Sequence, residues 1–356
     1  MRMTPPAKPR IALIIDSESW AFANISRQLV KHLGDRFDFK IIPAEVIDNI
    51  AQVLMMTRDC AVTHFFWRDF LNVVTQGFAR EYCHALGFSS HEVFLDRYVH
   101  HRTITTSVYD HLFLTDAEIH ARTPLFNDII DGYTVSSQRL MDAYKSIADF
   151  PNPDGVTEDG VDLGLFKPMN LSRLGMRGKR PMVIGWAGNS HWSRERGEDF
   201  KGLHTILKPA IEQLQCEGLN IRLDLADRQQ SQIPLEDMPA YYAGLDLYVC
   251  PSKIEGTPNP VFEAMACGVP VISTDVGVVP QAFDGDPFGM ILPERSVPAL
   301  KTRIRRHYEC APDRIRRISD YGLLKIRAWS WDRKAENFRR FFDRFLDTSH
   351  ASAYLS

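Results

Sequence analysis

Residues 249–277 constrain the fold most, because two buried-strand patterns there flank a segment long enough for one helix. One apolar run, LDLYVC, ends before Pro251, and another begins after Pro270. Short continuous apolar runs of this kind are typical of strands that are covered on both faces. The stretch therefore predicts strand, loop, helix and strand in succession, which is one unit of an open α/β sheet.

The helix in this stretch has recognisable ends. Asn259 is a suitable N-cap, and Pro260 suits the first helical position because its missing N–H would be unpaired there. Gly268 is a suitable stop after the last helical residue. This assignment places Glu255 in the loop and Glu263 one turn into the helix.

Length and composition indicate an ordinary globular protein of two domains. With 356 residues the chain exceeds a comfortable single core, so two domains of about 150 to 180 residues are expected. Hydrophobic residues make up 44% of the chain and charged residues 24%, and the formal net charge is −3. We expect no nucleic-acid partner, because phosphate neutralisation needs a clustered basic excess.

Targeting and redox signals are weak. No apolar run reaches the roughly 18 residues that cross a bilayer, and the start MRMTPPAKPR lacks the apolar core of a signal peptide. The six cysteines are scattered without CxxC pairs or zinc-like spacing, so reduced thiols are expected. We therefore expect a cytoplasmic location.

Strand and helix patterns alternate along both halves of the chain. In the first half, strand patterns cover residues 10–16, 39–43, 61–66, 103–109 and 132–136. In the second half they cover 182–186, 221–225, 247–250 and 271–274, with helix patterns over 203–214 and 238–243. No GxGxxG follows the first strand, which argues against a dinucleotide site of the dehydrogenase type. The alternation predicts an α/β protein with two doubly wound parallel sheets.

A segment rich in proline and glycine, residues 148–168, separates the two halves and is typical of a domain boundary. Beyond Ser296 the chain is helical and basic, and its last helical pattern, 335–346, is amphipathic. For the basic segment we favour a solvated helical face. The alternative is a patch for anionic lipid or a polyanionic acceptor, which would bring the protein to a membrane surface.

The two glutamates and their context resemble a known signature. Glu255, seven residues, Glu263 and then AMACGVPVISTDVG resemble the donor-site motif of retaining glycosyltransferase family four, which has the GT-B fold. The end of the N-terminal half is also similar to that family, at Gly160, Val161, Asp162, Phe166 and Pro168. The resemblance implies two Rossmann-like domains with a cleft between them. They are an acceptor-side domain at 1–165, with a helix at about 335–356 packing back on it, and a nucleotide-sugar donor domain at 166–334.

The glutamate spacing does not suit a hydrolase. If both residues were helical, about 12 Å along the helix axis would separate them, too far to flank one bond as acid and nucleophile. By resemblance, Glu255 accepts hydrogen bonds from donor-sugar hydroxyls and Glu263 holds the ribose hydroxyls of the nucleotide. Pro258 stands where the family commonly has glycine, and proline donates no hydrogen bond. The loop amides left to face the phosphates are those of Gly256, Thr257, Asn259 and Val261.

The resemblance also implies a cation for the departing diphosphate. Lys201, at the start of a helix, matches the phosphate-binding lysine of the family, and the alternative is an ordinary surface lysine. The usual arginine after the preceding strand is replaced by Asn189, so Arg194 or Arg196 would substitute for its charge. Gly188 would allow the backbone to approach phosphate closely.

In this family a histidine of the N-terminal domain commonly lies near the reacting centre, just before an aspartate. That slot holds Tyr109 here, so His111 is our first candidate and His64 the second, with a structural histidine as the alternative for each. Asp284 and Asp286 formally match the metal-binding Asp-x-Asp of another glycosyltransferase fold. We expect a turn there and no metal site.

The sequence thus predicts a metal-independent, retaining glycosyltransferase of the kind that builds cell-surface polysaccharides. Its co-substrate would be a nucleotide sugar, with no further cofactor, and its acceptor a glycan or glycolipid. Two alternatives stay open. One is a sugar-nucleotide epimerase of the same fold, and the other is a glycan-binding homologue without turnover. No oligomeric state is predicted.

Overall fold

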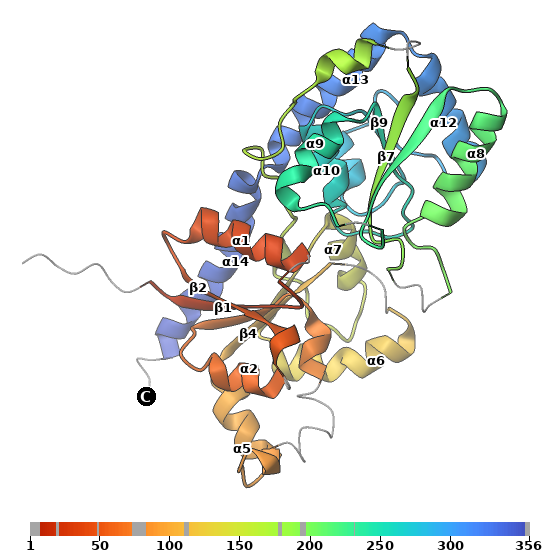
Figure 1. Ribbon diagram of the computed structural model, residues 1–356. Coiled ribbons are helices and arrows are strands. Elements are labelled where there is room, and N and C mark those ends of the chain that lie inside the picture. The colour runs from red at the N-terminus through yellow and green to blue at the C-terminus, as the bar shows by residue number, and fades with distance from the viewer. Residues whose placement is uncertain are drawn as a thin grey trace, which may run out of the picture. The chain divides into compact units, whose positions relative to one another are not determined.

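The structure is a computed structural model that describes residues 8–18, 21–47, 50–72, 83–109, 114–176, 180–192, 197–230 and 232–352. The chain separates into two compact units, which Figure 1 colours along the sequence. The first unit comprises Met1–Glu158 and Lys334–Ser356, and the second comprises Asp159–Arg333. Each unit is built on a parallel β-sheet of its own.

In the described part of the first unit, six parallel strands form one sheet in the order β2-β1-β3-β4-β5-β6. The last five residues of β1 are all buried, as expected for an interior strand that is covered on both faces. The strands are β1 (Arg10–Ile15), β2 (Asp38–Pro43), β3 (Val62–Phe65), β4 (Thr103–Val108), β5 (Gly132–Val135) and β6 (Gly155–Val156). The predicted patterns agree with β1 to β5 to within one residue at each end.

Strand β6 was not predicted, because two residues are too few to show a period. It lies inside the segment at 148–168 that we interpreted as a boundary. The hydroxyl of Thr157, just after β6, donates to Thr134 Oγ1 at 2.7 Å. The segment after it pairs within the second unit, where Val161 N–H donates to the carbonyl of Trp329 at 2.8 Å. The chain on either side of the boundary between Glu158 and Asp159 is therefore hydrogen-bonded within its own unit.

The helices of the first unit begin with side-chain caps where the sequence offers them. Ser137 accepts a hydrogen bond from the amide of Leu140 at 3.1 Å, and Thr115 and Glu118 form a capping box. The helices are α1 (Ala21–Leu33), α2 (Ile50–Met56), α5 (His91–Leu95), α6 (Asp116–Pro124), α7 (Gln138–Lys145) and, from Lys334 on, most of α14 (Trp331–Ser352).

Helix α14 carries an aromatic face into the first unit. The ring of Phe342 lies 6.1 Å from that of Phe37 and 6.3 Å from that of Phe39, centre to centre. Lys334 Nζ forms an ion pair with Glu158 at 3.3 Å, and both side chains are largely buried. The end of the chain therefore completes the core of a unit that begins near residue 10.

His64 lies in the middle of this core and is fully buried. Its Nδ1 is 3.0 Å from Thr105 Oγ1 and its Nε2 is 3.1 Å from Ser107 Oγ. Its ring contacts Phe66 and Phe342 at centre distances of 4.9 and 5.4 Å. Burial lowers the pKa of His64 from 6.5 to about 3, so the imidazole is neutral. The second histidine candidate is thus a structural residue and not a catalytic one.

In the described part of the second unit, four parallel strands form a sheet in the order β10-β9-β7-β8. They are β7 (Met182–Gly188), β8 (Ile221–Asp227), β9 (Leu247–Cys250) and β10 (Val271–Ser273). The helices are α8 (Lys208–Cys216), α9 (Met238–Ala243), α10 (Asn259–Ala266), α11 (Val279–Phe283), α12 (Val297–Glu309) and α13 (Pro312–Lys325). The helix predicted over 203–214 begins as a π-helical turn over Leu203–Leu207, before α8.

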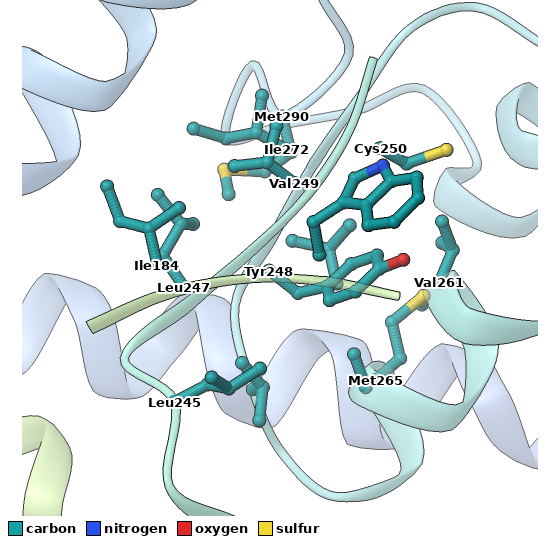
Figure 2. Close-up of a cluster of buried hydrophobic side chains, with 14 of the residues drawn as sticks. Ile184, Leu245, Leu247, Tyr248, Val249, Cys250, Val261, Met265, Ile272 and Met290 are labelled. Carbon is teal, nitrogen blue, oxygen red and sulfur yellow. The ribbon is translucent and has the colours of Figure 1, made fainter. Parts of the chain in front are cut away.

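Strand β9 shows why this sheet forms where it does (Figure 2). Its side chains alternate between two apolar layers, as the period of a strand requires. Leu247 and Val249 point to the layer that holds Ile184, Ile272 and Met290. Tyr248 and Cys250 point to the layer that holds Val261 and Met265 of α10. A slip of one residue would exchange the two layers, so the register is fixed by packing.

We predict a pH-dependent stability that comes from His64. Because the unfolded imidazole titrates near 6.5 and the folded one near 3, the unfolded state binds a proton first as pH falls. The stabilisation is fully present above 6.5 and is lost progressively below it, by about 2 kcal/mol at pH 5. Urea unfolding at pH 7 and pH 5 should show this loss in wild type and a smaller one in His64→Gln. Equal losses in the two proteins would refute the assignment.

Candidate functional site

The carboxyl ends of the strands in the second unit's sheet carry the predicted site. In parallel α/β sheets these ends lie at one edge, where loops and helix N-termini face a ligand. Here β7 ends at Gly188, β9 ends at Cys250 and β10 ends at Ser273. The loop of residues 251–258, which connects β9 to α10, lies at this edge and holds Glu255.

The 251–258 loop is anchored to its neighbours through backbone atoms. Thr274 Oγ1 donates to the carbonyl of Ser252 at 2.6 Å, which ties the loop to the end of β10. Arg295 Nε donates to the carbonyl of Pro251 at 2.8 Å. Lys253 N–H donates to the carbonyl of Phe200 at 2.7 Å. These bonds hold the loop in a defined conformation between two other connections of the sheet.

Gly277 lets the segment after β10 approach the backbone of the 251–258 loop closely. It has a φ of +49°, and a Cβ there would lie 1.8 Å from the carbonyl oxygen of Gly256. The next residue, Val278, donates its N–H to that same oxygen at 3.1 Å. The glycine that closes the motif TDVG is therefore required by the approach of two backbones.

Glu255 and Lys201 are brought together, as the resemblance implied. Lys201 Nζ donates to Glu255 Oε1 at 2.7 Å. The two side chains keep 20% and 16% of their surface exposed, so the pair is partly buried but open to a ligand. Lys201 immediately precedes Gly202, whose φ of +69° lets its backbone pass close to the carbonyl of Pro251. The role of Lys201 in binding phosphate stays a prediction.

Two of the four predicted phosphate-facing amides are already used within the loop. Asn259 N–H donates to the carbonyl of Thr257 and Val261 N–H to that of Pro258, both at 2.9 Å. Among the described residues, the amides of Gly256 and Thr257 have no hydrogen-bonding partner. These two remain for an anion. The prediction that Asn259 and Val261 also donate to phosphate is therefore corrected.

The start of α10 also differs from the prediction. The N-cap is Pro258, with no side-chain cap, and Asn259 is the first helical residue. The chain enters the helix one residue earlier than expected because the Pro258 carbonyl already accepts from Val261. The predicted stop is confirmed. Gly268 has a φ of +76°, and its amide donates to the carbonyl of Met265 at 3.0 Å.

Glu263 lies on α10, and its environment is different from that of Glu255. Its Oε2 accepts a hydrogen bond from the hydroxyl of Tyr242 at 2.7 Å. Burial raises the pKa of Glu263 from 4.5 to about 7, although the Tyr242 hydrogen bond and the charge of Arg228 act in the opposite direction. Near neutral pH Glu263 is therefore close to half protonated, whereas Glu255 forms an ion pair with Lys201.

Asn189 follows β7 and serves as a hydrogen-bond acceptor. Its Oδ1 accepts from His191 N–H at 3.0 Å and from Gln229 Nε2 at 2.8 Å. The predicted substitute cations, Arg194 and Arg196, lie outside the described residues.

Arg228 is a cation at this edge that the sequence prediction missed. It follows β8, its N–H donates to the carbonyl of Gly188 at 3.0 Å, and its side chain is exposed. It lies near enough to Glu263 to lower that carboxyl's pKa. The only available signal was its place directly after the strand run RLDLAD.

His111, the first candidate for the reacting centre, also lies outside the described residues. The segment at 284–286 is a turn, as expected. Asp284, Gly285 and Asp286 have φ values of +39°, +85° and +44°. Asp286 accepts from the amides of Met290 and Ile291 at 2.5 and 2.8 Å, so its carboxylate is engaged. Among the described residues, no group of three or more His, Cys, Asp or Glu side chains could hold a metal ion.

The basic helices carry several paired charges. Lys301 Nζ lies 2.7 Å from Glu217 Oε1, Arg305 pairs with the same carboxylate, and Arg316 lies 3.1 Å from Asp320. This agrees with a solvated helical face. Within the described residues, no helix is long and apolar enough to cross a membrane.

The chain is similar to known glycosyltransferases in sequence. A sequence model of the family described as Glycosyl transferases group 1 matches residues 205–310. O-antigen chain mannosyltransferase B of Escherichia coli is 34% identical over 30% of this chain and 27% of its own length. MMP alpha-(1->4)-mannosyltransferase of Mycolicibacterium hassiacum is 28% identical over 56% of this chain and 50% of its own length. The chain thus spans half or less of the length of these relatives.

Solved structures show the same fold at low identity. Sucrose-phosphate synthase of Thermosynechococcus elongatus superimposes with a TM-score of 0.67 and 16% identity, over 96% of this chain and all of the other. Anabaena HepE in complex with UDP-glucose gives 0.67 and 14% identity, over 94% and 99%. The chain therefore has the GT-B fold, and the predicted fold class is confirmed.

We predict that Glu263 makes the second unit less stable as pH rises. Its folded pKa of about 7 lies above the ordinary 4.5, so stabilisation by the protonated form is full below 4.5 and is lost as pH rises through 7. Glu263→Gln keeps an acceptor for Tyr242 but does not titrate. Between pH 5 and pH 8, wild type should lose about 2.5 kcal/mol of unfolding free energy relative to this variant in urea. No pH-dependent difference would contradict a raised pKa.

We also predict that Gly277→Ala destabilises the chain by about 2 to 4 kcal/mol, because positive φ strain adds to a backbone clash. Gly218→Ala is the matched control, since Gly218 has a φ of +90° and open space around its missing Cβ. Strain alone should make that variant about 1 kcal/mol less stable. Urea unfolding of both variants checks this. Equal losses of stability in the two variants would show that the close approach of Gly277 to Gly256 does not require a glycine.

Proposed function

We propose that the protein is a retaining glycosyltransferase that moves a sugar from a nucleotide sugar to a glycan or glycolipid acceptor. The observation that carries the proposal is the arrangement at the edge of the second unit's sheet. There Lys201 pairs with Glu255 of the 251–258 loop, two amides of that loop have no partner among the described residues, and Glu263 follows on α10. Such a site offers positive charge for a diphosphate and carboxylates for sugar hydroxyls.

Each group has a role in this proposal. As the bond between sugar and diphosphate breaks, negative charge grows on the departing phosphate oxygens. The ammonium of Lys201 and the amides of Gly256 and Thr257 would stabilise that charge, since they are fixed before the reaction begins. Glu255 would accept from hydroxyls of the donor sugar and Glu263 from those of the ribose. We propose that transfer is metal-independent, because these groups supply the required positive charge.

The relatives support the substrate class. Two of those described above are named mannosyltransferases, and HepE was solved with UDP-glucose. Other relatives are named for teichuronic acid, colanic acid and lipopolysaccharide core biosynthesis. A role in cell-surface polysaccharide synthesis fits these names, and a mannosyl donor is the first to test. In this proposal the first unit binds the acceptor and His111 lies near the reacting centre.

The test is to incubate the protein with a panel of nucleotide sugars and chelator, with and without mannose-containing glycan acceptors. Acceptor-dependent release of nucleotide is expected, with the anomeric configuration of the donor kept in the product. Isomerised donor without acceptor would indicate an epimerase instead. Binding without turnover would indicate a silent homologue, and an inverted product would refute the retaining mechanism.

In this assay Lys201→Ala and Glu255→Ala should each lower transfer by at least about 100-fold, which corresponds to roughly 3 kcal/mol of lost transition-state stabilisation. Their thermal midpoints should stay close to that of wild type, because the pair is partly exposed. Lys325→Ala is the matched control, since Lys325 forms an ion pair with Asp284 at 2.5 Å elsewhere in the same unit. Wild-type transfer by either site variant would remove the donor-site assignment.

A further inference from the structure

The Lys201 ammonium has a second neighbour besides Glu255. Its Nζ lies 5.0 Å from the centre of the Trp192 ring, within the range of a cation–π interaction. A carboxylate and an aromatic ring therefore hold the same cation. Neither the glutamate motif nor the resemblance assigns any role to Trp192.

Trp192 is itself held in place from two sides. Its backbone N–H donates to the backbone carbonyl of Asn189 at 3.2 Å, in the turn that follows β7. Its ring meets the buried ring of Phe200 edge to face, with centres 5.7 Å apart. Phe200 directly precedes Lys201, so the residue that packs against the indole is the backbone neighbour of the lysine. The Trp192 side chain remains half-buried, so it is not an ordinary core residue.

The two interactions differ in what an incoming anion does to them. A phosphate oxygen draws on the N–H donors of the ammonium that also serve Glu255, and its negative charge repels that carboxylate. It does not compete with the ring, which attracts the charge through its π-face. Lysine has a flexible four-carbon stem, and fixing it in one position opposes binding through lost rotamer entropy. A ring that already restrains the stem reduces this entropy loss when phosphate binds.

We propose that Trp192 is a positioning residue that keeps the Lys201 ammonium at the diphosphate site while it exchanges Glu255 for phosphate oxygens. The exchange frees the Glu255 carboxylate, which then accepts from hydroxyls of the donor sugar. Phosphate recognition and sugar recognition are thereby coupled through one lysine. This inference rests on the proposed function, since it requires a nucleoside diphosphate at this edge.

The test measures binding of GDP and UDP to the full chain by calorimetry. Trp192→Leu should lower the affinity for GDP and UDP by about 5- to 30-fold, the range of a partly desolvated cation–π contact. Trp192→Phe keeps a ring and should restore most of the loss. Tyr321→Leu is the matched control, because Lys325 Nζ lies 5.5 Å from that ring and also pairs with an aspartate. It should bind as wild type does.

A double-mutant cycle separates positioning from direct contact. In a Lys201→Ala background, Trp192→Leu should cause no further loss of diphosphate affinity. An equal loss with and without the lysine would overturn the proposal, because Trp192 would then act on the nucleotide itself. Unchanged binding by Trp192→Leu would overturn it too. If wild type bound no nucleoside diphosphate, the proposed function would fail first, and this inference with it.

Discussion

Parallel pairing of β9 with β7 and β10 is the constraint on which the rest of the second unit depends. It brings the carboxyl ends of these strands to one edge, so that residues far apart in sequence become neighbours. Lys201 and Glu255 are separated by 54 positions and yet share a hydrogen bond of 2.7 Å. The pairing is held by apolar layers on both faces of β9, with α10 packed on one of them. Stability and site geometry therefore have a common origin in the core of this unit.

Charge at this edge is arranged unevenly. Glu255 is paired with a lysine, whereas Glu263 accepts a hydrogen bond from the Tyr242 hydroxyl. The two carboxyl groups of the same motif thus have different surroundings, and burial raises the pKa of Glu263 to about 7. Glu255 meets its cation through Oε1, so its pairing with a sugar hydroxyl is tied to the position of Lys201. Glu263, about half protonated near pH 7, can accept a hydrogen bond in its ionised form and donate one in its protonated form.

The sequence allowed much of the fold to be predicted, because long apolar strands and helix-ending residues have clear patterns. β9 was predicted at Leu247–Cys250 and α9 at Met238–Ala243, as observed. The misses have physical reasons. β6 is too short to show a period. The amides of Asn259 and Val261 donate to nearby backbone carbonyls, and these bonds depend on the path of the loop. Arg228 could not be recognised because its relevance comes from a contact with the neighbouring strand, and Trp192 because its contact with Lys201 depends on the path of the connection after β7. His64 appeared to end a strand, but its burial depends on Phe342, nearly 280 positions later.

This last contact has a consequence for the order in which the protein is made. The second unit is one continuous stretch of chain, whereas the first draws on residues before 159 and after 333. As the chain leaves the ribosome, His64 and the rings of Phe37 and Phe39 are translated long before Phe342, which covers them. The unit that starts first is therefore the one that finishes last. Until α14 emerges, its uncovered aromatic surface is open to chaperones and to unwanted association.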